Sequence, residues 1–335
     1  MTIMLLLTFI IISLLFIICA CSSAPAKTPK KGAGAENGHV SEKDKKWSFT
    51  YPDMPVTLAD NAEEKIKYLS LHFWDNYDFT DTVAISRPEY AEQTLVDYLF
   101  ILARNEDERV IGNSLRRLAN DMRKDSTVYA WFDEKLEHYL YDPNSRMRND
   151  EYYLAVLQGI LESDNYQEVE KIRPAFRMKM LKKNRQGSMA ENFTYSLEGG
   201  KKGSLYGIKS LYTLLLLYDP ECENCHHAID MLVQSSVIRR LTTETEGMNR
   251  TPVKILTVCV ERDIDSWERH LSMLPEYWLN GFDGQQQIRD KELYDLRSFP
   301  SLYLLDNDKR VLLKDVDVQD VINYFTTLNM KGYEL

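Results

Sequence analysis

The sequence predicts an α/β domain that is preceded by an all-α domain. Between about 60 and 180 the apolar residues recur at helical spacing, and after Gly187 short β-type runs alternate with helical stretches. The chain has 335 residues, of which 44% are hydrophobic, so it can bury two cores of ordinary size. We therefore expect a helical domain over residues 47–183 and an α/β domain over residues 184–335.

The N-terminus has the features of an export signal. The first twenty residues carry no charge, and Met4 to Ile18 is an almost continuous apolar run that is short for a bilayer span. We therefore expect residues 1–20 to be a signal peptide, with an uncleaved anchor helix as the alternative. The segment Ile18-Cys19-Ala20-Cys21 resembles the lipobox of bacterial lipoproteins. The resemblance implies that Cys21 is lipidated and anchors the protein in a membrane of the cell envelope, facing the periplasm.

Composition bears on the tether and on the partners of the protein. Residues 21–46 are mostly Ala, Pro, Gly, Ser, Lys and Glu with almost nothing apolar to bury, so we expect a disordered tether. The chain has 51 acidic and 41 basic residues, which give a formal net charge of -10. A protein with this negative charge has little electrostatic affinity for the phosphates of a nucleic acid, so we expect no nucleic acid partner.

Four stretches of the helical domain carry apolar residues at helical spacing. They contain Leu95, Leu99 and Leu102; Leu115, Leu118, Ala119 and Met122; Phe132, Leu136 and Leu140; and Tyr152, Val156 and Ile160. Two aromatic and turn-rich pieces, residues 72–79 and 139–149, are expected to pack as irregular segments between helices, with a docking surface as the alternative. No catalytic constellation appears in this domain.

The α/β domain is predicted from runs of β-type residues and from turn residues between them. The expected strands are 193–197, 212–218, 253–260, 301–305 and 311–313, and the expected helices are 228–241 and 320–328. Hairpin turns are expected at 198–201 and 306–309. This order predicts a sheet with helices on both faces.

The cysteines of the folded part form a pair and a single residue. With Cys19 and Cys21 assigned to the N-terminal signal, Cys222, Cys225 and Cys259 remain, and an odd count argues against a scaffold of structural disulfides. Cys259 falls in a buried strand and is expected to be a small core residue. The pair needs another explanation.

Cys222-Glu223-Asn224-Cys225 lies where the strand 212–218 passes into the next helix. The partial positive charge of a helix N-terminus stabilises a thiolate, so the first cysteine should be nucleophilic while the second lies a turn further into the helix. The spacing lets both sulfurs meet in one bond. We therefore expect Cys222 to attack a partner and Cys225 to resolve the mixed disulfide.

Three landmarks in order resemble the thioredoxin superfamily, and especially its membrane-tethered TlpA- and ResA-like branch. They are the segment Gly187-Ser188-Met189-Ala190-Glu191-Asn192-Phe193, the Cys222–Cys225 pair, and Phe299-Pro300-Ser301 before the last hairpin. The preceding Tyr139–Ser145 segment resembles a helical domain of unknown function in Bacteroidetes lipoproteins. The resemblance spans about Gly187 to Leu335 and implies a thioredoxin-like domain over 184–335.

The resemblance also implies an activity. Pro300, in a cis peptide bond, would lie against the dithiol, and Phe299 would line the groove that receives a partner's cysteine-bearing strand. The partners would be exported proteins with cysteines or disulfides, which makes the protein a lipid-anchored thiol–disulfide oxidoreductase. No dinucleotide-binding glycine pattern is present, so no cofactor is expected and electrons would come from a membrane redox protein.

Other interpretations of the same residues remain open. Cys222-Glu223-Asn224-Cys225-His226 also fits the C-x-x-C-H pattern of c-type haem attachment, and a zinc site would need ligands beyond these residues and His227. Alternatively, the helical domain recognises a partner and the α/β domain is only a scaffold. Around the pair, Glu221 and Glu223 disfavour a thiolate whereas a protonated His226 or His227 favours it, so the direction of electron flow stays open.

Overall fold

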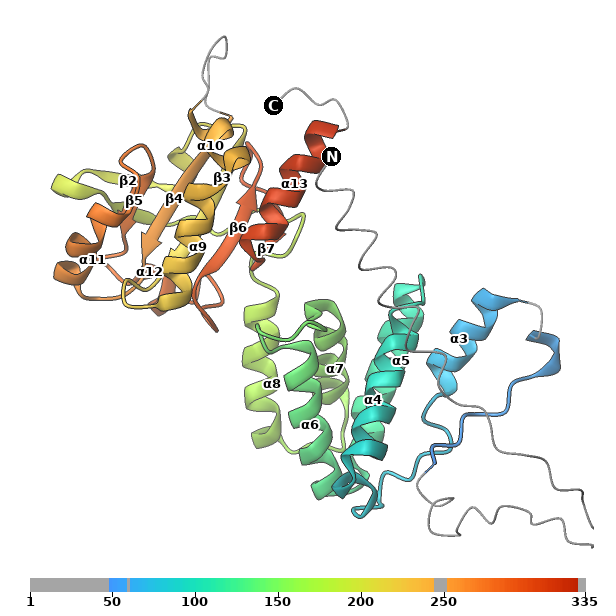
Figure 1. Cartoon of the computed structure of the whole chain (residues 1–335). Helices are drawn as coiled ribbons and strands as arrows, with labels where there is room; N and C mark the ends of the chain where they lie inside the picture. The colour runs from blue at the N-terminus through green and yellow to red at the C-terminus, as the bar shows by residue number, and fades with distance from the viewer. Residues whose placement is uncertain (1–47, 59–60, 244–251, 331–335) are drawn as a thin grey trace, which may run out of the picture. The chain divides into compact units, whose positions relative to one another are not determined.

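The computed structural model describes residues 48–58, 61–243 and 252–330. From Phe49 onward they form one compact unit (Figure 1). The predicted signal peptide, the tether and Cys21 lie outside the described residues, so they stay predictions. Within the three described stretches, no helix is both long enough and apolar enough to cross a bilayer.

The first part of this unit, residues 49–58 and 61–182, has helices as its only regular elements and is called the helical region below. Its α-helices are α3 (Ala62–His72), α4 (Pro88–Leu102), α5 (Glu108–Asp121), α6 (Ser126–Leu140), α7 (Asp150–Glu162) and α8 (Glu168–Leu181). Short 3-10 turns are η1 (Val56–Leu58), η2 (Ala84–Ser86) and η3 (Met122–Lys124). Side-chain oxygens of Asn61, Asp107, Asp125 and Asn149 accept hydrogen bonds from the first amides of α3, α5, α6 and α7. These caps fix where each helix begins.

The helical region has one continuous core. The apolar residues expected at helical spacing are buried there, except that Tyr152 is half-buried at its edge. Phe73, Trp74, Tyr77 and Phe79 from the aromatic segment 72–79 also lie in this core. The prediction that this segment packs between helices is therefore confirmed.

The second part, residues 187–330, is built on a seven-stranded mixed sheet and is called the sheet region. Its strands are β1 (Thr194–Ser196), β2 (Lys202–Ser204), β3 (Tyr212–Tyr218), β4 (Val253–Cys259), β5 (Leu279–Phe282), β6 (Ser301–Leu305) and β7 (Val311–Lys314). They lie in the order β2-β1-β5-β4-β3-β6-β7. The central β3 pairs in parallel with β4 and antiparallel with β6. Its apolar side chains are buried alternately in the two cores on the two faces of the sheet.

The helices of the sheet region are distributed unevenly over its two faces. They are α9 (Glu223–Gln234), α10 (Ser236–Thr243), α11 (Ile264–His270), α12 (Gln287–Asp290) and α13 (Val318–Met330), with 3-10 turns η4 (Glu198–Gly200), η5 (Leu205–Gly207) and η6 (Leu271–Met273). Residues of α9, α10, α11 and α13 share one core against the sheet, and α9 and α13 lie across this face in Figure 1. The opposite core receives Ile288 of the short α12 and is otherwise covered by irregular segments. The expectation of helices on both faces is thus met on the second face only by the short α12 and the 3-10 turn η5.

The expected helix 228–241 is wrong in its extent. The chain forms α9 from Glu223 and then breaks at Ser235, whose backbone is extended. The Ser235 hydroxyl accepts a hydrogen bond from the amide of Ile238 at 3.3 Å and so caps α10. A serine at a helix end competes for backbone bonds in this way, which divides one apolar pattern between two helices.

The segment between the two regions is attached to the sheet region. The side chain of Asn184 donates to the carbonyl of Leu293 at 2.9 Å and accepts from the amide of Glu191 at 2.8 Å. The amide of Gly187 donates to the carbonyl of Val311 at 2.8 Å. The domain boundary between residues 183 and 184 stays a prediction, because both regions belong to one compact unit.

Candidate functional site

The candidate site begins at the end of β3, where a tight turn leads into α9. The Cys222 amide donates to the carbonyl of Asp219 at 3.1 Å, and the Asp219 carboxylate accepts from the amide of Glu221 at 2.9 Å. This turn places Cys222 at the N-cap of α9. Other helices of this chain have Asp or Asn at that position, so a thiol here stands where an anionic or polar cap usually lies.

The sulfur of Cys222 has two backbone partners. The Cys225 amide donates a hydrogen bond to the Cys222 Sγ at 3.3 Å, and the Cys222 thiol lies 3.7 Å from the carbonyl oxygen of Phe299. The residue as a whole is half-buried, in contrast to the other two cysteines of the described chain, which are buried. The amide contact is the one that would stabilise a thiolate at this position.

Cys225 lies behind Cys222 in the first turn of α9 and is completely buried. Burial raises the pKa of its thiol well above the ordinary value, and the hydrogen bond with the Cys222 side chain acts in the same direction. Both cysteines are free thiols in this structure. The two neighbouring cysteines therefore differ: Cys222 is half-buried, whereas Cys225 is buried and its thiol holds its proton.

Phe299 and Pro300 reach the pair through the sheet. Strand β6 begins at Ser301, which pairs with Leu217 near the end of β3, so the residues just before β6 meet the turn after β3. The Phe299–Pro300 peptide bond is cis. The structure thus brings together Cys222, Cys225, Phe299 and Pro300, the residues that the sequence nominated, while their catalytic and groove-lining roles stay predictions.

Two of the titratable neighbours of the pair, Glu221 and His226, have hydrogen-bond partners other than the cysteines. Glu221 accepts a hydrogen bond from the Ser266 hydroxyl at 2.6 Å, which lowers the pKa of its carboxyl group. Nε2 of His226 lies 2.6 Å from the carbonyl oxygen of Pro220, whereas the side chain of His227 is exposed.

These contacts do not fit haem attachment. A C-x-x-C-H haem site needs both sulfurs at the surface to bond the porphyrin, whereas Cys225 is fully buried and His226 is bonded to its own turn. In the described part of the chain, no three His, Cys, Asp or Glu side chains are grouped so that they could hold a metal ion.

Cys259 is a core residue, as expected. It is fully buried at the end of β4, in register with Tyr218 of β3, and its thiol lies 3.9 Å from the carbonyl oxygen of Glu261. Burial raises the pKa of the Cys259 thiol to about 12. A thiol that stays protonated in the core is a poor nucleophile.

A charged residue that no sequence motif indicates, Arg297, lies near the site. Arg297 lies two residues before Phe299, and its Nη2 is 3.0 Å from Asp150 Oδ1 and 3.2 Å from Asp315 Oδ2. Asp150 belongs to the helical region, 147 positions earlier in the chain. No local pattern in the sequence connects residues so far apart.

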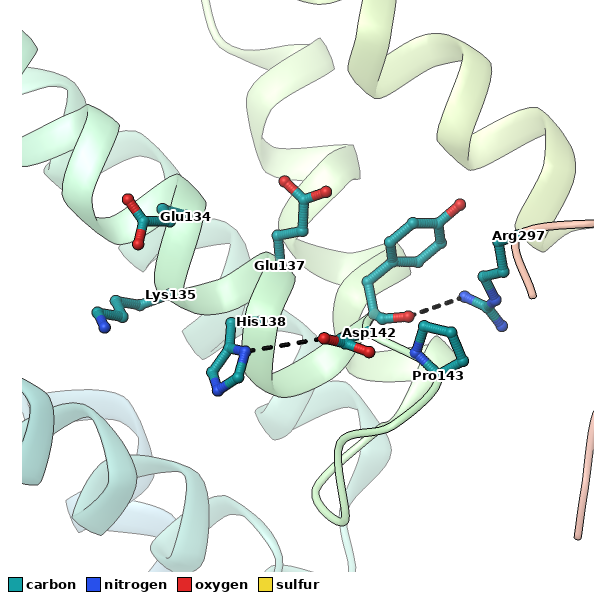
Figure 2. Close-up of a pocket in the computed structure, with 8 residues that line it drawn as sticks. Glu134, Lys135, Glu137, His138, Asp142, Pro143 and Arg297 are labelled. Carbon is teal, nitrogen blue, oxygen red and sulfur yellow. Dashed lines mark hydrogen bonds and ion pairs between the residues drawn. The ribbon is translucent and has the colours of Figure 1, made fainter. Parts of the chain in front are cut away.

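Arg297 also lines an open hollow of about 580 Å³ beside the C-terminal turn of α6. The hollow is lined by Glu134, Lys135, Glu137, His138, Tyr141, Asp142, Pro143 and Arg297. Figure 2 shows Arg297 facing the turn that holds Asp142 and Pro143, and its Nη1 donates to the carbonyl of Tyr141 at 3.3 Å. The segment 139–149, expected to pack between helices with a docking surface as the alternative, therefore also contacts the sheet region.

The chain is similar to solved structures from Bacteroides. A thioredoxin-like protein from Bacteroides caccae is 37% identical with a TM-score of 0.75, over 84% of this chain and 98% of that one. The C-terminal domain of an uncharacterized protein from Bacteroides fragilis is 40% identical with a TM-score of 0.40, over 43% of this chain and 98% of that one. A conserved Bacteroides fragilis protein of unknown function is 28% identical with a TM-score of 0.39, over 42% and 98%.

A family model also matches the N-terminal part of the chain. It is described as a domain of unknown function, DUF5106, and it matches residues 20–184. No curated protein matches this chain. The similarity to the Bacteroides caccae structure covers too much of the chain to be confined to the sheet region.

Proposed function

Because the chain belongs to the family of thioredoxin-like proteins, we propose that it is a thiol–disulfide oxidoreductase that acts on partner proteins through Cys222 and Cys225. One observation carries the proposal. The sulfur of the half-buried Cys222, at the N-cap of α9, accepts a hydrogen bond from the Cys225 amide, and the buried thiol of Cys225 lies next to it. This is the asymmetry that a two-step exchange requires, since one sulfur must meet the partner and the other must meet only its neighbour.

The reaction proceeds in two displacements. The Cys222 thiolate attacks one sulfur of a partner disulfide; the partner S–S bond breaks, a mixed disulfide forms, and the second partner sulfur leaves as a thiolate that takes up a proton. Cys225 then loses its proton and attacks Cys222 Sγ, which releases the first partner sulfur. Two electrons pass from the cysteine pair to the partner, and the pair ends as a disulfide. A dithiol protein must reduce it again.

The Cys225 proton sets the order of these steps. Burial and the neighbouring Cys222 sulfur raise the pKa of the Cys225 thiol, so the resolving sulfur is neutral while Cys222 is free. Once Cys222 is tied up in a mixed disulfide it no longer opposes ionisation of its neighbour by charge. Resolution would therefore follow attack and not compete with it.

Phe299 and Pro300 supply one side of the substrate groove in this proposal. The Phe299 carbonyl lies at the Cys222 thiol, where a partner strand would approach, and the ring packs against both cores of the sheet region. The clients would be exported proteins with cysteines or disulfides. We further propose that Cys21 anchors the protein by a lipid in the cell envelope and that a membrane redox protein supplies the electrons.

A trapping experiment tests the function. With Cys225→Ser, the mixed disulfide cannot be resolved, so partners are expected to accumulate on Cys222 in cells and to be identified by mass spectrometry. Cys259→Ser is the matched control, because it removes a buried thiol that takes no part, and it should trap nothing. In vitro, the wild type should reduce insulin disulfides with dithiothreitol as the electron source, and Cys222→Ser should not.

The opposite results would exclude an oxidoreductase. If the wild type and Cys222→Ser reduce insulin at the same rate as dithiothreitol alone, and Cys225→Ser carries no adduct, the cysteine pair is not catalytic. A cellular phenotype that survives replacement of both cysteines by serine would then assign the biological role to partner recognition by the helical region.

A further inference from the structure

Arg297 is the central cation of a group of charged side chains that connects the helical and sheet regions. We call this group the Arg297 cluster; its other members are Arg148, Asp150, Asp295, Lys314 and Asp315. Arg148 and Asp150 come from the start of α7 and the turn before it. In the sheet region, Asp295 and Arg297 precede β6, Lys314 is the last residue of β7, and Asp315 follows it.

Arg297 holds three separate pieces of backbone at once. Its Nη2 contacts Asp150 at the start of α7 and Asp315 just after β7, at 3.0 and 3.2 Å. Its Nη1 donates to the carbonyl of Tyr141 at the end of α6, and its Cζ lies 4.5 Å from the centroid of the Tyr141 ring. A planar guanidinium with several fixed donors suits such a junction, whereas an ammonium group cannot make all these bonds.

The cluster is shielded from water. The side chains of Arg297, Asp315 and Asp150 are 7%, 5% and 22% exposed. Burial alone would lower the pKa of Arg297, but the carboxylates of Asp150 and Asp315 outweigh it and raise the pKa above the ordinary value. Ion pairs shielded in this way are little screened by salt, and the loss of one partner leaves a buried charge behind.

Arg297 lies two positions before Phe299, whose carbonyl oxygen contacts the Cys222 sulfur. Arg297 and Phe299 are joined through Ser298, whose carbonyl accepts a hydrogen bond from the Ser301 hydroxyl at 3.0 Å. The Phe299 carbonyl lies 3.7 Å from Cys222 Sγ. Only one residue separates Arg297 from Phe299, so the position of the Arg297 backbone restricts where the Phe299 carbonyl can lie.

We propose that Arg297 is a positioning residue for disulfide exchange: Asp150 and Asp315 hold it, and it holds residues 297–300 against Cys222. This rests on the proposed function and adds a role for the helical region. Through Asp150 and Tyr141 the helical region holds in place residues 297–300, the side of the groove along which a partner strand would bind. It would thereby affect exchange with proteins without touching either cysteine.

The test compares a protein disulfide with a small one. Insulin needs the wall for binding, whereas the small aromatic disulfide DTNB needs only an accessible Cys222 sulfur. Arg297→Met should lower kcat/KM for insulin by about 10- to 100-fold, since small misplacements of a binding wall are costly, and should leave the DTNB rate within about 3-fold. Arg297→Lys should recover part of the insulin rate because it keeps the charge but not the planar fork.

Two further variants make the result independent of folding defects. Asp150→Asn removes one carboxylate from the helical region and should lower insulin reduction less than Arg297→Met does. Lys179→Met is the matched control: it breaks the Lys179–Glu292 ion pair, which also joins the two regions but whose lysine is 56% exposed. Its insulin rate should stay within about 2-fold of the wild type. Circular dichroism and urea unfolding confirm that each variant is folded.

Each outcome decides between two claims. If the folded Asp150→Asn and Arg297→Lys proteins reduce insulin like the wild type, or if insulin and DTNB rates fall by the same factor in both, the positioning role is wrong. If Lys179→Met loses as much as Asp150→Asn, the effect belongs to any contact between the regions and the role is equally wrong. If the wild type itself reduces neither substrate, the proposed function fails instead.

Discussion

The thiol of Cys222 lies 3.7 Å from the carbonyl oxygen of Phe299, a residue 77 positions further along the chain. The antiparallel pairing of β6 with β3 creates this contact, because it sets the segment before β6 beside the turn after β3. The Cys222 sulfur therefore has one backbone partner in its own helix, the Cys225 amide, and one in the segment before β6, the Phe299 carbonyl.

The three thiols should differ in their reaction with iodoacetamide. Cys222 is half-buried, whereas Cys225 and Cys259 are completely buried. In the native reduced protein, Cys222 should be alkylated first, and the other two should react at least about 10-fold more slowly because their sulfurs are reached only when the structure opens. Peptide mapping by mass spectrometry measures each rate. Equal rates at Cys222 and Cys225 would contradict the asymmetry of the pair.

Alkaline pH should destabilise the fold through Cys259. Burial raises the pKa of this thiol from 9.0 to about 12, so the folded state keeps the proton to a higher pH than the unfolded chain does. The contribution to stability is complete below the unfolded value near 9 and is lost as the pH rises toward 12. When the pH is raised from about 8 to about 10.5, the free energy of unfolding of the wild type should fall. That of Cys259→Ala should fall by less, with a difference of up to about 2 kcal/mol in urea unfolding. Parallel losses in both proteins would show that Cys259 is not the source.

A close helix contact predicts the effect of a methyl group at Gly159. A Cβ there would lie 2.8 Å from the Ala119 Cβ and from two backbone atoms of Arg116, so Gly159→Ala should lower the free energy of unfolding by about 1–3 kcal/mol. Gly112→Ala is the matched control, since its Cβ would meet only the flexible end of the Arg116 side chain. That change should be neutral or should stabilise by up to about 1 kcal/mol. Urea unfolding compares the two; equal losses would mean that α5 and α7 are not in such close contact.

The pair of Arg297 and Asp150 should be coupled in stability. Arg297→Met removes the cation that Asp150 and Asp315 share, although Lys314 and Arg148 remain as their partners. It should cost about 1–3 kcal/mol, because charge-assisted bonds of largely buried side chains are lost. A double-mutant cycle with Asp150→Asn should give a coupling energy of about 1–3 kcal/mol, measured by urea unfolding at neutral pH. Losses that add within about 0.5 kcal/mol would show that the two residues act independently.

Local sequence patterns predicted the elements of this protein well. Apolar spacing located the helical core, and the run Tyr212–Tyr218 matches β3 residue for residue. The expectation of a thioredoxin-like domain after an all-α one is confirmed by the solved relative. The expected helix 228–241 was wrong because apolar spacing alone does not reveal the break and cap at Ser235.

The sequence by itself determined that two cysteines stand where a strand passes into a helix, because helix starts and strand ends depend on residues only a few positions apart. Tertiary structure alone decided that Phe299 meets Cys222 and that Arg297 meets Asp150, 147 positions away. It also decided that one face of the sheet is covered by segments with little helix. Such contacts depend on how the whole chain packs, and no short stretch of sequence contains that information.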